Sequence, residues 1–398
     1  MNRVLKVLVI ILLVVLVAGA SSLLTAGWMM SQYEAEISDD AVRYKMERLT
    51  ALLDTYFIDE YDQQKLEAAA ADGAASAMIA ATGDKWSYYI SAEQMRAYEE
   101  QMNNEYVGIG VTILEREEGV EIMEIFAGSP AEKAGIQVGD ICIAVEGEEI
   151  AGFGTEKTQI LVRGEPGTIV NMTFKRGDEV YTVDVERGAI VVPVAEWTML
   201  DQNIAWITIN NFDSHCAEQT LDCIDRALEQ GAEALLFDVR FNGGGYKDEM
   251  VQILDELLPE GDVFRSVDYR GKEEVITSDA HCLKLPMAVL VNEESYSAAE
   301  FFAAALQEYG VASVVGVKTT GKGNFQYTLE LGDGSAVAIS TGKYFTPKGI
   351  SLTDVGITPD VVIDLSDEDF GALYYGRLEP AEDEQLQAAV EVLLDKIS

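Results

Sequence analysis

Two short loops of this sequence carry side chains that could act together in covalent catalysis. Ser297 opens a segment with a helical pattern, whereas Lys322 lies between two glycines and Gln326 follows it by four residues. A serine at a helix N-terminus exposes its hydroxyl and has backbone N–H groups nearby that could receive an oxyanion. A lysine removed from water favours its neutral amine, which could accept the serine proton. If the chain after Lys322 is extended, Gln326 points to the same face and could orient the amine.

Each of these residues also has an ordinary structural explanation. The pattern Ser297-x-x-Glu300 is a capping box, and most serines in this position only cap a helix. The run from Gly316 to Lys322 approaches a phosphate-binding loop, but Gly323 replaces the hydroxyl residue that would bind magnesium. A strand-like pattern follows, where a phosphate-binding loop needs a helix. Phosphate binding is therefore disfavoured.

Other catalytic groups and cofactors find little support in the sequence. The chain contains two histidines, His215 and His281, and neither has the context of a Ser-His-Asp triad member. Its four cysteines show no metal-type spacing, and no HExxH motif is present. We therefore expect buried free thiols, no metal site and no cofactor.

The candidate loops follow apolar runs that predict buried strands. Short apolar runs that alternate with helical patterns predict a parallel sheet, and open α/β sheets bind ligands at the carboxyl ends of their strands. A glycine loop follows a third such run, so we expect three loops to form one site. The runs and the loops that follow them are Met287–Val291 with Ser297, Ser313–Val317 with Lys322, and Ala234–Val239 with Gly243–Gly245. Helices are predicted at 41–56, 63–81, 214–230, 247–258 and 383–396.

The segment 105–188 differs from its surroundings, because it combines short strand patterns with glycine turns. Gly128–Asp140 and Arg163–Thr168 are close to the "GSPA…AGI…GD" and "RG…GT" signatures, so the segment resembles a PDZ domain. PDZ domains add a peptide tail to an open strand edge and capture its terminal carboxylate with backbone N–H groups. The resemblance assigns this capture to the loop Val107-Gly108-Ile109-Gly110. A dinucleotide-binding role for the loop is set aside, because a third glycine and a following helix are missing.

From about Ala41 to Asp364, the chain resembles the C-terminal processing peptidases, also called tail-specific proteases. The strongest marks are Asp238–Gly245, Asn292–Glu300, Gly316–Gln326 and Gly356–Asp360. The resemblance implies an α/β fold, with a crotonase/ClpP-like mixed α/β protease core, an inserted β-rich PDZ domain, and N- and C-terminal helices. It also implies a Ser-Lys dyad supported by a glutamine.

The resemblance assigns a role to individual residues. The dyad falls on Ser297 and Lys322, and the supporting glutamine falls on Gln326. The oxyanion hole, formed in the family by the glycine loop and the residue after the serine, falls on Gly244 and Ala298.

Three positions depart from the family pattern. Gly243 stands where a proline is common, and Tyr296 and Ala299 replace smaller or hydroxylated residues beside the nucleophile. These changes bear on the shape of the pocket more than on the dyad.

The N-terminal segment carries a targeting signal. Arg3 and Lys6 precede the apolar run Val7–Ala20, and no charge follows until Glu34. About 20 apolar residues span a bilayer, and the flanking positive charges favour an N-terminus inside the cell. We therefore expect a single-pass anchor in the cell membrane with the catalytic part outside the cytoplasm. The alternative is a secreted protein, because Ala18-Gly19-Ala20 resembles a signal-peptide cleavage site.

The net charge limits the kind of partner. The chain has 398 residues, with 28 Lys and Arg against 69 Asp and Glu, for a formal charge of −41. Such a surface repels phosphate backbones, so we expect no nucleic-acid partner. We expect an anchor or signal segment at 1–33, a helical region at 34–104, a PDZ domain at 105–188, a peptidase core at 189–365 and a C-terminal helical segment at 366–398.

These patterns predict a membrane-anchored serine endopeptidase that recognises protein or peptide substrates by their free C-terminal tails. The family resemblance also suggests a homo-oligomer formed through the terminal helices. Two alternatives stay open, namely a catalytically inactive PDZ tail-binding scaffold and a crotonase-like acyl-transfer enzyme. The region 34–104 shows no chemistry of its own, and we expect its helices only to pack on the body or on a second subunit.

Overall fold

The computed structural model describes residues 41–397, which form two compact units divided between Thr82 and Gly83. In the first unit, residues 41–56 are helical and α2 spans Gln63–Ala80. Its alanine-rich sequence favours the helical conformation of α2. The Asp62 side chain caps this helix by accepting hydrogen bonds from the backbone N–H groups of Gln64 and Lys65.

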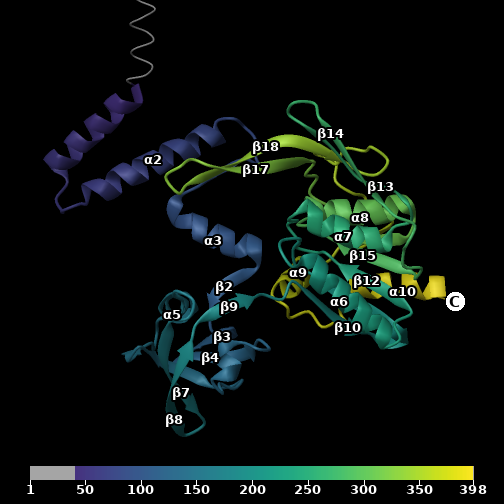
Figure 1. Ribbon diagram of the computed structural model, residues 1–398, viewed down its shortest axis with the longest axis horizontal. Helices are drawn as coiled ribbons and strands as arrows, with labels where there is room; N and C mark the ends of the chain where they lie inside the picture. The colour runs from purple at the N-terminus through teal and green to yellow at the C-terminus, as the bar shows by residue number, and fades with distance from the viewer. Residues whose placement is uncertain (1–40, 398) are drawn as a thin grey trace, which may run out of the picture. The chain divides into compact units, whose positions relative to one another are not determined.

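The second unit contains a six-stranded sheet that carries the predicted catalytic loops (Figure 1). Its strand order is β10-β11-β12-β15-β16-β19, and all neighbours pair in parallel except β10 and β11. Connections that contain a helix join β11 to β12, β12 to β15 and β15 to β16, as the alternating sequence pattern predicts. The six strands span Ala195–Met199, Ile204–Ile209, Ala234–Asp238, Met287–Val291, Ala312–Gly316 and Val361–Val362.

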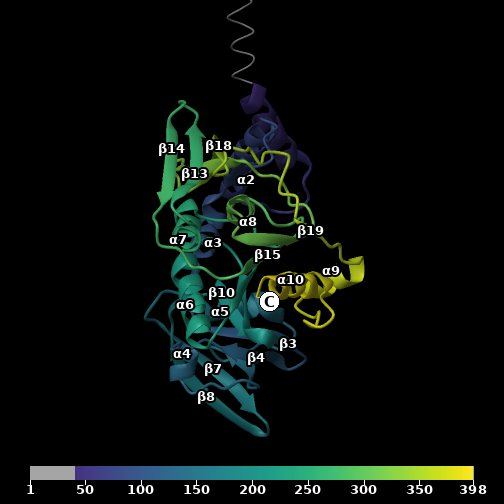
Figure 2. The same ribbon diagram turned by 90° about the vertical axis from the view of Figure 1, so that its right-hand side faces the viewer.

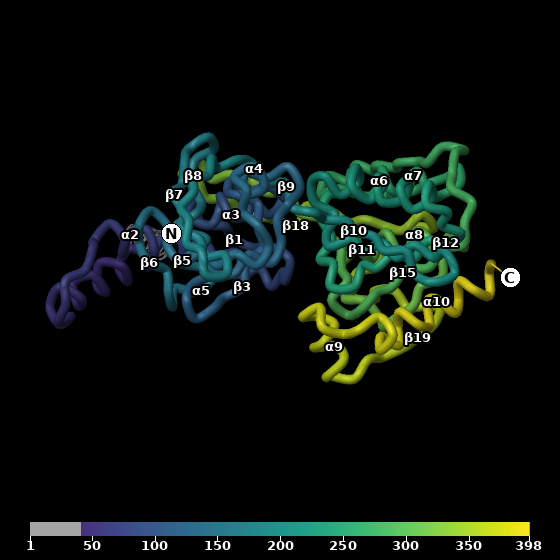
Figure 3. Tube along the Cα trace, turned by 90° about the horizontal axis from the view of Figure 1, so that it is seen from below, coloured from purple at the N-terminus to yellow at the C-terminus, as the bar shows by residue number. Residues whose placement is uncertain are grey.

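Helices cover both faces of this sheet, because its central strands are apolar on both sides. Leu235 packs in the cluster with α6, α7 and α8, whereas its neighbour Leu236 packs in the cluster with α10. This alternation is the two-residue period of a strand. Figures 2 and 3 show α10 on the opposite side of the sheet from α6 and α7. The four helices span Cys216–Glu229 (α6), Lys247–Leu257 (α7), Ala298–Tyr309 (α8) and Glu384–Ile397 (α10).

A buried ion cluster ties α10 to the sheet. Arg240 follows β12, and its Nη2 lies 2.6 Å from the Oδ2 of Asp238. Its Nη1 lies 2.8 Å from the Oδ2 of Asp383, which precedes α10. All three side chains are buried, and removing one partner from such a pair costs about 3–5 kcal/mol, because it leaves an uncompensated charge. The cluster therefore fixes α10 against the end of β12.

A second sheet carries the chain beyond Lys322. It pairs β1, β18, β13 and β14 in that order, all antiparallel, and β17 also pairs with β18. Lys322 lies between β16 and β17, so the loop that holds it joins the two sheets. The strands span Tyr88–Ile90 (β1), Gly261–Asp268 (β13), Glu273–Ser278 (β14), Asn324–Glu330 (β17) and Ala336–Phe345 (β18).

The predicted PDZ domain folds around a separate sheet with the order β3-β4-β5-β7-β8, and β6 pairs with β5. β2 (Glu105–Gly108) pairs antiparallel with β9 (Gly188–Val191), so the chain enters and leaves this domain through neighbouring strands. Such adjacent ends allow a domain to be inserted without disturbing the sheet on either side. Its other elements span Val111–Arg116 (β3), Gly119–Ile125 (β4), Pro130–Lys133 (α4), Ile141–Val145 (β5), Glu148–Glu149 (β6), Gly154–Val162 (α5), Ile169–Arg176 (β7) and Glu179–Glu186 (β8).

The predicted fold class, a mixed α/β core with an inserted β-rich domain, is confirmed. The strand-like pattern after Lys322 corresponds to β17, which forms a long hairpin with β18. The remaining elements are α3 (Ala92–Asn103), a short 3₁₀ turn (Asp201–Asn203) and α9 (Asp367–Tyr374). The predicted anchor at 1–33 lies outside the described residues. Within 41–397, no helix combines the length and the apolar character needed to cross a bilayer.

Candidate active site

A cleft of about 1010 Å³, called here the main cleft, opens beside the carboxyl ends of the parallel strands. Ser297, Ala298, Lys322 and Gln326 all line it. Gly245 lines it as well, at the end of the glycine loop that follows β12. The structure therefore brings the three loops into one cavity, and the chemical roles of their residues stay predictions.

Ser297 adopts an uncommon backbone conformation at the start of α8. Its φ of 62° and ψ of −123° lie where residues other than glycine are rare. The glycine loop packs so closely against it that a side chain on Gly244 would lie 2.6 Å from the Ser297 Cβ. Strain of this kind costs about 1–3 kcal/mol and persists only where the surrounding structure enforces it. A sharp strand-to-helix turn also exposes the nucleophilic serine of other hydrolases.

The Lys322 amine lies among aromatic rings. Its Nζ is 4.8 Å from the centroid of the Trp86 ring and 5.8 Å from that of the Tyr296 ring. Burial disfavours the charged amine and lowers the pKa of Lys322 from 10.5 to about 8, although the charges of Asp84 and Glu300 act in the opposite direction. A lysine with this pKa is partly neutral near pH 7, as a general base must be.

One carboxylate connects the two catalytic loops. Glu300, in the first turn of α8, is completely buried. Its Oε2 accepts hydrogen bonds from the backbone N–H groups of Ser297 (3.1 Å) and Lys322 (2.8 Å). Its Oε1 accepts from the Gly321 N–H at 2.6 Å and from the Thr319 hydroxyl at 2.5 Å. Burial raises the pKa of Glu300, and these four donors oppose that rise. The expected capping residue therefore also holds the Lys322 loop.

Tyr344 lies close to both Ser297 and Lys322. A hydrogen bond from Ser297 lowers the pKa of Tyr344, but complete burial outweighs it and raises the pKa of this phenol far above its usual range. The Tyr344 hydroxyl in turn donates to the backbone carbonyl of Lys322. Within residues 41–397, no hydrogen bond joins the Lys322 amine to the Ser297 hydroxyl. Proton transfer between them therefore requires a side-chain rotation from this arrangement.

Gln326 lines the main cleft but is held by its own hairpin. Its Nε2 donates to the Asn324 carbonyl at 3.3 Å and to the Ser340 hydroxyl at 3.1 Å. Ser340 belongs to β18, the strand that pairs with β17. Within the described part of the chain, Gln326 makes no hydrogen bond to Lys322, so its orienting role stays a prediction.

The two N–H groups predicted to bind an oxyanion differ in whether a hydrogen-bond acceptor already occupies them. Ala298 is the first residue of α8, where backbone N–H groups have no acceptor within the helix. The Gly244 N–H instead donates to the Oδ1 of Asn242 at 2.8 Å. The Asn242 side chain is fixed in turn, because its amide donates to the Ile209 carbonyl at 2.7 Å. In this conformation, Gly244 therefore presents no free N–H group to an oxyanion.

Sequence patterns missed two groups that surround Lys322. Asp84 and Trp86 both come from the region 34–104, to which no chemistry was assigned. That expectation was incomplete, because the Trp86 ring covers the Lys322 amine. The available signal was a short cluster of polar and aromatic residues, Asp84 to Tyr89, which interrupts the helical pattern. The cluster gives no indication of its partner, because the contact joins distant parts of the chain.

The predicted PDZ domain contains a groove of about 290 Å³ lined by residues of β3 and α5. Gly108 and Ile109 from the predicted carboxylate-binding loop line this groove. Gly110 has a φ of 77°, so a glycine is favoured at this turn. Arg163, at the end of α5, donates to the Oε2 of Glu100 on α3 at 2.7 Å. The groove has the location that tail recognition requires, and its ligand stays a prediction.

Comparisons with known proteins identify related sequences. The model of peptidase family S41 matches residues 203–363, and the model of the PDZ domain matches residues 107–186. A "Probable CtpA-like serine protease" of Staphylococcus aureus (strain MSSA476) is 33% identical over 331 residues, which cover 82% of this chain and 66% of the relative. A protein of the same name from Staphylococcus epidermidis (strain ATCC 12228 / FDA PCI 1200) is 33% identical over 324 residues, covering 80% and 65%. The chain thus spans slightly less than two thirds of the length of these curated relatives.

One solved structure extends over most of the chain. The photosystem II D1 C-terminal processing protease is 24% identical, with a TM-score of 0.47. The match covers 85% of this chain and 92% of that protein.

Proposed function

Because this chain belongs to the C-terminal processing peptidases of family S41, a family of serine peptidases, we propose that it is a serine endopeptidase with a Ser297–Lys322 dyad. We also propose that its PDZ domain recognises the free C-terminal tail of protein substrates. The folded part acts outside the cytoplasm and is held at the cell membrane by residues 1–33.

The setting of Lys322 supports the dyad most strongly. An amine buried beside Trp86, with its pKa lowered to about 8, shares the main cleft with the hydroxyl of Ser297. Burying a lysine costs free energy because its charge is desolvated, and a lysine with a lowered pKa in a cleft is typical of functional sites. Glu300 accepts a hydrogen bond from the backbone of each partner, which fixes the distance between the two loops.

The proposed reaction proceeds in two halves. In the first, the Ser297 oxygen attacks the scissile carbonyl carbon while the neutral Lys322 amine takes the hydroxyl proton. The C–N bond then breaks, and the Lys322 ammonium returns a proton to the leaving amine. In the second half, water attacks the acyl-enzyme ester and gives a proton to Lys322. The ester C–O bond then breaks, and Lys322 returns the proton to the Ser297 oxygen. This step releases the carboxylic acid and restores the Ser297 hydroxyl.

One supporting group must rearrange before the first half can occur. Gly244 can donate to the oxyanion together with Ala298 only after the Gly244 N–H leaves Asn242. The Gln326 Nε2 donates to the hairpin, which leaves the side-chain carbonyl of Gln326 free to accept a hydrogen bond from the Lys322 amine. We therefore infer that the described conformation is a resting state, and that an extended substrate in the main cleft displaces the contact between Gly244 and Asn242.

The test uses the full-length protein in detergent and a mixture of peptides with free or amidated C-termini. Mass spectrometry should find internal cleavage that is faster for peptides with a free terminus. Ser297→Ala and Lys322→Ala should each lower kcat by at least about a thousandfold, because nucleophile and base act as one unit. Lys318→Ala is the matched control, since Lys318 is an exposed lysine in the same loop, and it should retain activity.

Retained turnover in the purified Ser297→Ala protein would contradict the assignment of the nucleophile. Equal cleavage of free and amidated peptides would leave the protease in place and contradict tail recognition by the PDZ domain.

A further inference from the structure

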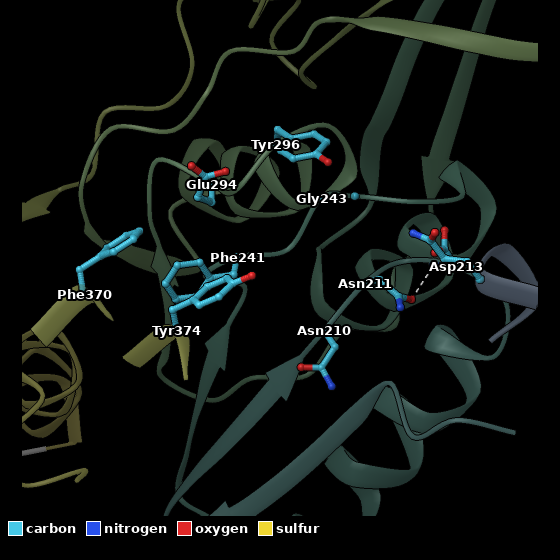
Figure 4. Close-up of a pocket in the computed structure, with 11 residues that line it drawn as sticks. Asn210, Asn211, Asp213, Phe241, Gly243, Glu294, Tyr296, Phe370 and Tyr374 are labelled. Atoms are coloured by element: carbon cyan, nitrogen blue, oxygen red, sulfur yellow. Dashed lines mark hydrogen bonds between the residues drawn. The ribbon is translucent and has the colours of Figure 1, made fainter. Parts of the chain in front are cut away.

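A second cavity of about 670 Å³, called here the side pocket, lies along the other part of the glycine loop. Gly243, Gly244 and Tyr296 line it, so it borders the residues that flank Ser297 (Figure 4). Because a side chain on Gly244 would lie 2.6 Å from the Ser297 Cβ, the side pocket begins within one residue's length of the nucleophile. Asp213 lines both the side pocket and the main cleft.

Asp213 is a buried carboxylate without a partner. Its exposed fraction is 5%, and within residues 41–397 no hydrogen bond or ion pair reaches its side-chain oxygens. Only its backbone is held: its N–H donates to the Oδ1 of Asn211 at 2.9 Å, and its carbonyl accepts from the Cys216 N–H at 3.2 Å. Burial, with a smaller contribution from the charge of Glu249, raises the pKa of Asp213 to about 7. Buried carboxylates are normally paired, so Asp213 offers a charge-assisted hydrogen bond to a cation from outside the folded chain.

The rest of the side pocket fits an elongated cation. Among the described residues, no lysine, arginine or histidine lines it, and Glu294 adds a second carboxylate. One wall is aromatic: the Phe241 ring centroid lies 5.1 Å from that of Phe370 and 5.4 Å from that of Tyr374. In Figure 4 these rings gather on one side, and Asp213 lies beyond Gly243 on the other. Such a pocket offers apolar contact to a chain of methylene groups and a carboxylate to a terminal charge.

We propose that the side pocket is a substrate subsite for a lysine or arginine side chain close to the scissile bond, and that Asp213 is the residue that selects its charge. The inference rests on the proposed endopeptidase function and adds the class of residue preferred beside the cut. A basic side chain supplies the missing partner of Asp213 through a charge-assisted hydrogen bond. A neutral side chain of the same length gains only the apolar contact, and an acidic one meets like charge.

The experiment starts from any peptide that the full-length protein cleaves. Each of the three residues on either side of the cut is replaced in turn by lysine, arginine, norleucine or glutamate. At one position, lysine and arginine should raise kcat/KM about tenfold to a hundredfold over norleucine, the range that a hydrogen bond to a charged group supports. Asp213→Asn should abolish that ratio by lowering kcat/KM for the lysine and arginine peptides to the value for the norleucine peptide.

A matched control and a binding measurement separate this proposal from the proposed function. Asp222→Asn removes an exposed carboxylate from the nearby helix α6 and should leave the preference intact. In a Ser297→Ala background, the lysine peptide should bind at least about tenfold more tightly than the norleucine peptide, and Asp213→Asn should remove the difference. All peptides keep the same free tail, so the PDZ contribution cancels in the ratio.

The outcomes are distinct. If wild-type protein cleaves every peptide but shows no basic preference, or if Asp213→Asn slows all peptides equally, the subsite proposal is overturned and the endopeptidase stands. If no peptide is cleaved, the endopeptidase proposal fails, and the binding ratio still decides whether the side pocket selects a cation.

Discussion

Replacing Trp86 by alanine should move the pH dependence of catalysis to higher pH. The Trp86 ring has two opposing effects on the Lys322 amine, whose Nζ lies 4.8 Å from the ring centroid. The ring excludes water, which lowers the pKa of Lys322, and it attracts the charged form through a cation–π contact, which raises that pKa. Alanine removes both effects, so the direction of the change shows which one is larger.

The magnitudes favour desolvation. A pKa lowered from 10.5 to about 8 corresponds to about 3 kcal/mol against the charged amine. A cation–π contact contributes about 0.5–2 kcal/mol in favour of it. At pH 7, about a tenth of the amines are neutral when the pKa is about 8, against about one in three thousand at 10.5. Full exposure of Lys322 would therefore lower kcat/KM at pH 7 by up to about 300-fold.

The assay is kcat/KM for one cleaved peptide between pH 6 and pH 10, because this ratio reports the essential pKa values of the free enzyme. The wild-type value should rise with pH through a midpoint near 8, since only the neutral amine accepts the proton. Trp86→Ala should raise the midpoint toward 10.5, and Trp86→Phe should leave it close to the wild-type value because a ring remains.

The reasoning is refuted if Trp86→Ala folds and its midpoint is unchanged or lower. A wild-type rate that falls between pH 7 and pH 9 would contradict a lysine base altogether.

Two further predictions concern the same site. Lys322→Met should raise the free energy of unfolding at pH 7 by up to about 3 kcal/mol, because the lowered pKa of Lys322 removes stability as pH falls from 10.5 through about 8. Thermal unfolding is measured at pH 7 and pH 10.5, with Ser297→Ala as the control. The gain in stability should appear only at the lower pH. Glu300→Gln should slow labelling of Ser297 by a fluorophosphonate at least about tenfold. The reason is that one of the four hydrogen-bond donors to this buried carboxylate would face an amide N–H group instead of an oxygen. Labelling at a rate within twofold of wild type would rule out the proposed link between the loops.

The placement of the proposed catalytic loops could be predicted from the sequence because their strands are strongly apolar. Met287–Val291 and Ala312–Gly316 form neighbouring parallel strands, so the loops after them must open at the same edge of the sheet. That geometry follows from chain direction alone and brings Ser297 and Lys322 to the main cleft.

The surroundings of these residues could not be predicted, because they depend on contacts between distant segments. The strand period predicted the face of Gln326, but its partner Ser340 comes from a hairpin whose register the sequence did not reveal. Similarly, the family resemblance assigned the Gly244 N–H to the oxyanion hole, yet the acceptor for this N–H is the side chain of Asn242. The sequence could not distinguish Asp213 from other acidic loop residues, because its burial depends on the folded structure.

The position of α10 has a consequence for how the protein matures. This helix supplies Leu386, Ala389 and Leu393 to one face of a sheet whose strands lie earlier in the chain. Until residues 384–397 have been synthesised, Leu236 and Leu290 on that face lack the side chains of α10 that pack against them. A chain truncated before residue 384 would therefore expose an aggregation-prone apolar surface to chaperones and to other nascent chains. Protein quality control can thus recognise an unfinished molecule even after Ser297 and Lys322 have been synthesised.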